Sequence, residues 1–259
     1  QLGGGPKPFP NLGQINYDLY DGVANYNSLQ TQFNHRFSRG LTSTASYTWS
    51  HTLDDSDGLF GFFTPDSLIF GQHRLNRGNS VLDQRNIFSF SNLYELPFGR
   101  GKTFGSNWGR GLDMAAGGWQ INTLVQLQSG QPLTVQYPDF GGNFSQRPIQ
   151  TGVLRQPHSI SALWFDPSVF TKPATGQQGN VGRNSIYGPG FIDLDLSIFK
   201  DFAITERVHS QLRGEAFNLT NTPAFTNPIG SLTDPNAGRI TATRQASERQ
   251  LQLAVRFTF

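Results

Sequence analysis

The residues that most resemble catalytic or ligand-binding motifs lack the spacing that such chemistry requires. Gly101, Lys102 and Thr103 are similar to the end of a phosphate-binding loop, but the first glycine of that motif falls on Leu96. The stretch is therefore interpreted as a Gly-rich turn.

The acidic run at 54–58 is similar to the start of a calcium-binding loop. Its first ligand position falls on Leu53, however, and its twelfth on Thr64 rather than on glutamate. A loosely bound cation and a solvated acidic loop remain as alternatives, and the solvated loop is favoured. The 5 histidines share no metal-ligand spacing, and no Ser/His/Asp arrangement can be argued. The sequence thus predicts no enzyme, no metal site and no cofactor.

The most regular polar pattern lies in two runs near the C-terminus. Alternate residues from 207 to 215 are polar, and acidic residues alternate with apolar ones just before them. Alternate side chains of a strand share a face, which yields one polar row: Asp193, Asp195, Arg207, His209, Gln211, Arg213 and Glu215. This row is either a binding face or a charged network that lines a barrel. Placing Phe199 opposite Arg207 predicts Asp193 and Arg213 as a cross-strand pair facing the lumen.

The final twelve residues alternate just as strictly. One face is apolar, with Leu251, Leu253, Val255, Phe257 and Phe259; the other carries Gln250, Gln252, Ala254, Arg256 and Thr258. Such a strand could close a soluble sheet or be the last strand of an outer-membrane β-barrel. We place Gln250, Gln252 and Arg256 with the lumen-facing candidates.

Composition favours strands with a single apolar face. Only 36% of the 259 residues are hydrophobic, yet 13% are aromatic, including 22 Phe. No apolar run is long enough for a transmembrane helix, whereas alternating barrel strands leave a weaker hydropathy signal. The absence of cysteine excludes disulfides, and a net charge of +2 with scattered basic residues indicates no nucleic-acid partner. Residues 1–10 are loop-like with no visible signal peptide, so for an exported protein they would not be the original start.

Period-two patterns predict seven strands, at residues 24–37, 41–50, 86–96, 119–128, 191–199, 207–217 and 248–259. A turn at 38–40 joins the first two and predicts their register. Phe33 should oppose Ala45, Thr31 should oppose Tyr47, and Leu29 should oppose Trp49, because then apolar meets apolar and polar meets polar.

The connections separate by length. Those on the side of the C-terminus are 38–40, 97–118 and 200–206, and those on the other side are 51–85, 129–189 and 219–247. Short turns on one side and long loops on the other are typical of membrane barrels. Trp49, Trp119 and the Phe257/Phe259 pair lie near strand ends, where aromatic girdles occur. The fold class predicted is an all-β, antiparallel up-and-down transmembrane barrel segment.

The sequence also resembles the C-terminal barrel of TonB-dependent outer-membrane receptors of the Oar-like group. The matching stretches are SYTWSHTLDD from Ser46, GGWQ from Gly117, SGQP from Ser129, FDPSVF from Phe165, GNVGRNSIYGPGFIDLDLSIFKDF from Gly179, ITER from Ile204 and RGEAFNLTNTPAF from Arg213.

The resemblance implies a plugged receptor of about 22 strands. Its partners would be TonB, a plug domain, outer-membrane lipid, the barrel-assembly machinery and an unidentified nutrient. The assembly machinery would recognise the terminal strand through Leu253, Val255, Phe257 and Phe259. The long loops would be extracellular and the C-terminus periplasmic, in a bacterial outer membrane.

Seven is an odd number of strands, whereas bacterial single-chain barrels have an even one. Residues 1–259 are therefore expected to be the C-terminal part of a barrel, without the plug and N-terminal modules and with strands 24–37 and 248–259 as unpaired edges. The leading hypothesis is energised nutrient uptake. The alternatives are a structural or adhesive barrel and a soluble all-β carbohydrate-binding domain.

Overall fold

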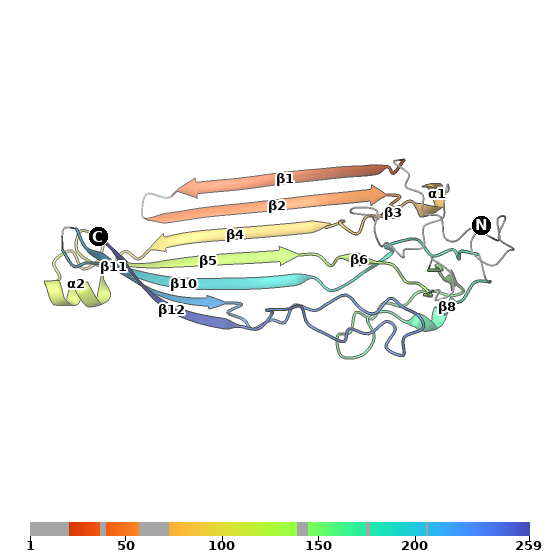
Figure 1. Ribbon diagram of the computed structural model, residues 1–259. Helices are drawn as coiled ribbons and strands as arrows, with labels where there is room; N and C mark the ends of the chain where they lie inside the picture. The colour runs from red at the N-terminus through yellow and green to blue at the C-terminus, as the bar shows by residue number, and fades with distance from the viewer. Residues whose placement is uncertain (1–20, 37–39, 57–72, 139–144, 175–176, 206) are drawn as a thin grey trace, which may run out of the picture.

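The computed structural model describes residues 21–36, 40–56, 73–138, 145–174, 177–205 and 207–259. Seven long strands form one antiparallel sheet in which neighbours in sequence are neighbours in space (Figure 1). They are β1 (Ala24–Arg36), β2 (Leu41–Asp54), β4 (Asn86–Glu95), β5 (Trp119–Gln128), β10 (Phe191–Ala203), β11 (His209–Phe217) and β12 (Gln250–Thr258). A short strand, β3 (Gly78–Asn79), pairs with the end of β2. The all-β, up-and-down prediction is confirmed, and no helix in the described ranges has the length and apolarity to cross a membrane.

The predicted register of the first hairpin is confirmed. Phe33 opposes Ala45, Thr31 opposes Tyr47 and Leu29 opposes Trp49. Gly40 has a φ of 76°, the left-handed conformation expected of the last residue in this turn. Phe37, the strand end next to the turn, lies outside the described residues.

The predicted register of β10 and β11 is wrong. Phe199 lies opposite Arg213 rather than Arg207, and Asp193 lies opposite Gln126 of β5. The reason is that β10 does not stop at Phe199 but continues to Ala203. The chain turns only at 204–208, where the Ile204 amide donates to the Val208 carbonyl at 2.9 Å. Arg207 belongs to this turn, because β11 begins at His209.

Cysteine pairs are expected to distinguish the two registers, because the chain has no cysteine of its own. Phe199→Cys with Arg213→Cys places the two residues directly opposite each other, within the Cα separation that a disulfide requires. Asp193→Cys with Arg213→Cys separates them by about 20 Å along the strand. Oxidation should cross-link the first pair and leave the second reduced on a gel. Cross-linking of the second pair alone would instead support the register predicted from the sequence, with Asp193 opposite Arg213.

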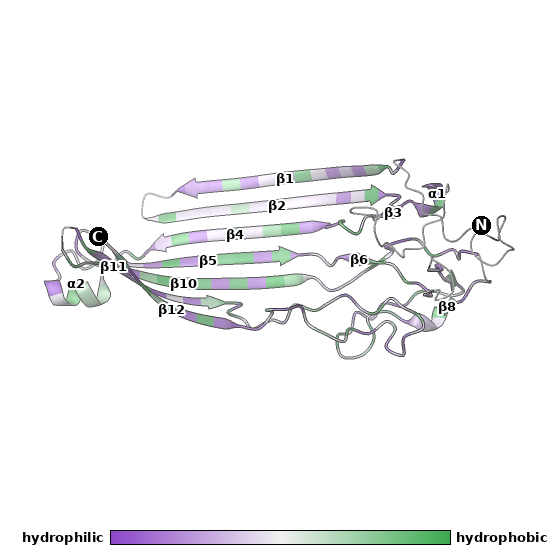
Figure 2. Cartoon of the chain, viewed as in Figure 1, coloured by the Kyte–Doolittle hydropathy of each residue, from purple (hydrophilic) through white to green (hydrophobic). Residues whose placement is uncertain are grey.

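The sheet has one apolar and one polar face, visible as alternating stripes along the strands in Figure 2. The register places these residues together on the apolar face: Tyr47, Trp49, Phe88, Phe90, Ile121, Val125, Leu127, Ile192, Leu194, Leu196, Ile198, Leu212, Leu251, Leu253, Val255 and Phe257. Much of this face is uncovered, with Leu253 86% exposed. A face with so little protein cover requires lipid or another apolar partner.

The main cluster of buried apolar side chains lies in the long connections rather than against the sheet. Val135, Phe165, Phe170, Val181 and Ile186 form it. Two short antiparallel strand pairs support this region. β6 (Pro132–Leu133) pairs with β9 (Ile186–Tyr187), and β7 (Ile149–Gln150) pairs with β8 (Phe170–Thr171). A turn of 3₁₀ helix, η1 (Pro167–Val169), directly precedes β8. A single-layered sheet with an uncovered apolar face has no core of its own, so this core stabilises the connections.

The two ends of the sheet differ as the loop lengths predict. The C-terminus and helix α2 (Arg110–Ala116) lie at one end, and α1 (His73–Asn76), β3, β6 and β8 lie at the other (Figure 1). Within the described residues, β1 and β12 each have a single neighbour and are the edges of the sheet. Trp49 and Trp119 lie toward opposite ends of the apolar face, as predicted.

Candidate functional site

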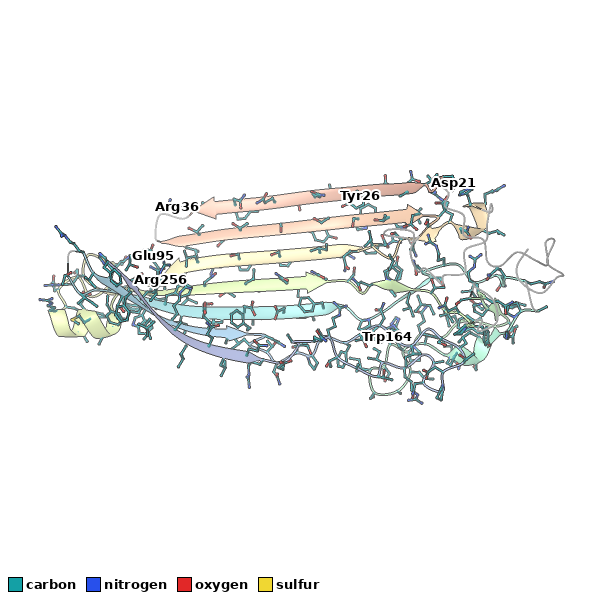
Figure 3. The ribbon with its side chains drawn as sticks, viewed as in Figure 1. Asp21, Tyr26, Arg36, Glu95, Trp164 and Arg256 are labelled. Atoms are coloured by element: carbon teal, nitrogen blue, oxygen red, sulfur yellow. The ribbon has the colours of Figure 1, made fainter. Side chains whose placement is uncertain are left out.

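The polar face of the sheet collects nearly all the polar candidates that the sequence singled out, whereas Leu253, Val255 and Phe257 lie on the apolar face. Paired residues share a face, which places Asp193, Asp195, His209, Gln211, Arg213, Glu215, Gln250, Gln252 and Arg256 together. Arg207 is the exception, because it lies in the turn before β11. Figure 3 shows side chains along the sheet, with Tyr26, Glu95 and Arg256 marking strands from one edge to the other. That this face lines a lumen stays a prediction, because the sheet is open.

The sequence predicted paired charges on the polar face, whereas the structure disperses them. The Arg213 guanidinium lies over the ring of Phe199, 4.8 Å from its centroid, and its Nη1 is 4.0 Å from Oε1 of Glu215. Asp195 accepts a hydrogen bond from the Asn218 amide at 2.9 Å. Among the described residues, the face therefore offers separate polar contacts rather than one closed ion-pair network, and the register keeps Asp193 away from Arg213.

A buried ion pair joins the long connections to the end of β2. Arg183, 2% exposed, directs its Nη2 to the carboxylate and the carbonyl oxygen of Asp54, the last residue of β2. Its Nε donates to the carbonyl of Asn76 in α1 at 2.9 Å. One side chain thereby fastens segments 129 residues apart in sequence.

A second buried carboxylate, Asp83, organises the same region. It is fully buried and accepts hydrogen bonds of 2.7 Å each from the Thr52 amide, Nε of Arg85 and the hydroxyl of Tyr187. Burial, with the hydrogen bond to Asp83, raises the pKa of Tyr187 to about 12. Tyr187 thus stays a neutral donor, and the carboxylate with its three donors holds the end of β2 against the 129–189 connection.

Two asparagines complete the contact between the connections. Nδ2 of Asn79 donates to the carbonyl of Asn184, and Nδ2 of Asn184 donates to the carbonyl of Asn79, both at 2.8 Å. Asn184 has a φ of 51°, a conformation that asparagine tolerates better than most residues. We call Asp54, Asp83, Arg85, Arg183, Asn184 and Tyr187 the loop network.

Sequence reasoning missed the loop network and misjudged part of it. The favoured interpretation of the acidic run, a solvated loop, is wrong for Asp54 and Asp55, which are 8% and 5% exposed. Residues 57–58 of that run lie outside the described residues. The available signal was a single arginine in the otherwise uncharged stretch 179–190, because an arginine that becomes buried there requires a partner.

Asp55 lies in a chain of contacts with His73 and Asp21. Its carboxylate accepts from the Val23 amide at 2.7 Å and contacts Nδ1 of His73 at 2.8 Å, while Nε2 of His73 is 3.1 Å from Asp21. Because the two ring nitrogens point to different carboxylates, the three side chains do not converge on one point, and no group of residues in the described ranges is arranged to hold a metal ion.

These contacts make the start of β1 sensitive to pH. The hydrogen bond to Asp55 raises the pKa of His73. Burial alone would raise the pKa of Asp55, but the bonds from Val23 and His73 outweigh it and lower that pKa. The stabilisation by His73 is therefore complete below its ordinary pKa and lost as pH rises through the raised value. The stabilisation by Asp55 is present above its ordinary pKa and lost as pH falls through the lowered one.

We expect hydrogen exchange at residues 21–26, corrected for the intrinsic rate, to accelerate once pH exceeds the raised pKa of His73. His73→Gln should abolish this pH dependence. Exchange in that variant that still accelerates over the same pH range would show that another group is responsible.

An apolar cleft of about 670 Å³ lies where the connections meet the sheet. Phe88, Leu127 and Ile192 form its wall on the apolar face, and His158 and Trp164, with ring centroids 4.8 Å apart, line it from the 129–189 connection. The cleft thus opens on the face opposite the predicted lumen, and it is not part of the polar face.

The comparison with known proteins agrees with this geometry. A family model described as outer membrane beta barrel domain matches residues 4–252. No curated protein and no solved structure shows significant similarity to the chain. An alternating sheet with one uncovered apolar face, one polar face and long connections at one end is what such a domain requires. The chain belongs to the outer membrane beta barrel domain family, and its place is the bacterial outer membrane.

Proposed function

We propose that the chain forms part of the wall and outer loops of a TonB-dependent receptor of the Oar-like group, which takes up a nutrient with energy from the inner membrane. The observation that carries the proposal is the loop network. Asp54 belongs to SYTWSHTLDD, whereas Arg183, Asn184 and Tyr187 belong to GNVGRNSIYGPG, two of the stretches on which the resemblance rests. These stretches, far apart in sequence, make one buried contact.

The open sheet supports a wall segment of a wide barrel. Both edge strands lack a second neighbour within the described residues, and barrel diameter grows with strand number. We propose that further strands of the receptor complete the wall and that a plug domain fills it. The long connections would be extracellular, and the C-terminus would lie in the periplasm with the site of TonB contact. The polar face would line the lumen, and the chain would have no catalytic role and no cofactor.

Uptake assays test the proposal. A strain lacking the gene, one lacking TonB and a complemented strain would be grown on peptides, glycans and metal chelates supplied singly as limiting nutrients. We expect a growth defect on one nutrient class in the first two strains and its rescue in the third. A growth defect in the strain lacking the gene that the strain lacking TonB does not share would contradict the proposal. So would the absence of a defect on every nutrient.

A structural or adhesive barrel is the second candidate, and the packed core of the connections favours it. Val135, Phe165 and Ile186 are at most 1% exposed, so the outer region is a folded body able to present a fixed surface. Loss of surface adhesion with unchanged growth on every nutrient would support this function instead. The soluble carbohydrate-binding alternative is set aside, because the family is one of membrane barrels.

A further inference from the structure

A pocket with basic walls lies at the end of the sheet opposite the loop network. It has a volume of about 330 Å³ and is bounded by the connection between β4 and β5, with α2, and by the end of β10. The charged residues that line it are Arg100, Lys102, Arg110, Asp113, Lys200 and Asp201.

The pocket is continuous with the apolar face of the sheet. Lys200 alternates with Ile198 and Leu196 and therefore lies on that face. Its side chain is 2% exposed, donates to the carbonyl of Gly117, and lies 5.3 Å from the ring centroid of Trp119 and 5.2 Å from that of Phe202. In a membrane barrel, a buried ammonium among aromatic rings at the end of the apolar face is expected at the level of the lipid headgroups.

Positive charge in the pocket exceeds negative charge. Both carboxylates already accept hydrogen bonds: Asp113 from the Arg100 amide at 2.7 Å, and Asp201 from Gln211 at 2.8 Å. Lys102 pairs with Glu95 at 2.7 Å. The guanidinium groups of Arg100 and Arg110 make no ion pair among the described residues, and both side chains are exposed. Two arginines remain for an anionic ligand.

Partly exposed apolar side chains belong to the same region: Phe98 and Met114 line the pocket, and Phe104 packs against Phe98. Phe98 and Phe104 pack with ring centroids 5.7 Å apart and are 41% and 56% exposed, and Met114 is 54% exposed. Aromatic and apolar groups beside arginine are the composition of surfaces that rest in the headgroup layer. A free inorganic anion would leave these groups in water, whereas a lipid covers them with its acyl chains.

We propose that this pocket binds the headgroup of an anionic phospholipid such as phosphatidylglycerol. The phosphate is held by Arg100 and Arg110 above Lys200, and the acyl chains descend along the apolar face past Trp119 and Phe202. Planar guanidinium groups suit phosphate oxygens because they donate two parallel hydrogen bonds. The inference rests on membership of the barrel family and not on the proposed transport.

Native mass spectrometry of the intact protein, extracted from outer membranes and stripped of lipid in a nonionic detergent, tests the pocket. Phosphatidylglycerol and phosphatidylcholine with the same chains would be titrated separately. The wild-type protein should bind phosphatidylglycerol on the order of ten-fold more tightly. Arg100→Gln with Arg110→Gln should remove that preference. The control variant, Arg74→Gln with Arg155→Gln, loses the same charge at exposed sites in α1 and in the 129–189 connection. It should preserve the preference for phosphatidylglycerol.

Folding of each variant is checked by the heat-dependent gel mobility of folded barrels, and the single variants replace the double one should it not fold. Equal wild-type affinity for both lipids would overturn the proposal, as would an unchanged preference in the folded Arg100/Arg110 variant. Complete displacement of phosphatidylglycerol by excess inorganic phosphate would identify a site for small anions instead.

Discussion

Replacement of Arg183 by methionine is expected to destabilise the long connections by about 3–5 kcal/mol, the typical cost of leaving a buried charge without its partner. The Asp54 carboxylate would stay inside the protein, where its side chain is 11% exposed, without the guanidinium that now compensates its charge. The hydrogen bond to Asn76 would be lost as well. Limited proteolysis of the protein in micelles should then cleave the 129–189 connection, which in the wild type should resist.

Two variants isolate the cause of that effect. Arg155→Met removes an arginine from an exposed position of the same connection and should leave cleavage unchanged. Asp54→Asn combined with Arg183→Met removes both charges and should recover part of the resistance, because no uncompensated charge remains. If Arg183→Met resists protease as well as Arg155→Met does, the buried pair does not hold the connections together.

Replacement of Phe259 by alanine is expected to lower the amount of protein in the outer membrane severely while leaving the folded protein as stable as before. Phe259 is 93% exposed, so its side chain is almost uncovered by the described part of the chain. Surface substitutions of this kind change stability by no more than about 0.5 kcal/mol. An effect in cells would therefore reflect the proposed recognition of Leu253, Val255, Phe257 and Phe259 by the assembly machinery.

The measurement compares outer-membrane levels in cells with urea unfolding of the protein refolded in micelles. Phe33→Ala is the matched control, because Phe33 is an exposed phenylalanine on the apolar face of the other edge strand, β1. Its level in the membrane should stay near that of the wild type. Equal losses for the two variants would argue against a signal specific to the C-terminal strand.

The strands could be predicted from the sequence because alternation is a local property. Gln30 and Gln32 against Thr48 and Ser46 specify the first hairpin, since a slip of one residue would exchange its two faces. The prediction that β10 ends at Phe199 failed, and the reason is also physical. Lys200 was predicted as the first residue of the 200–206 connection, yet it continues the strand on the apolar face. There its ammonium donates to the Gly117 carbonyl and lies over the Trp119 ring. A tertiary contact thus overrode the polarity of the residue.

The loop network could not be predicted, because its partners share no local pattern. Asp54 ends β2 and Arg183 lies in the 129–189 connection, and a carboxylate at a strand end is usually solvated. The segment from 129 to 189 was predicted only as a long loop, and the fold alone places Phe165 and Ile186 in one core. Long-range contacts of this kind follow from the topology of the sheet, which brings the long connections to the same end.

Spin labels along β5 provide the most direct test that the sheet is a membrane wall. Single cysteines from residue 119 to 128 would be labelled in lipid vesicles, and collisions with oxygen, which concentrates in lipid, would be compared with those of a water-soluble nickel complex. Oxygen accessibility should peak at Ile121, Val125 and Leu127, and nickel accessibility at Asn122 and Gln126, with a period of two residues. Uniform accessibility to the nickel complex along the strand, or the opposite phase, would contradict an outer-membrane wall with this register.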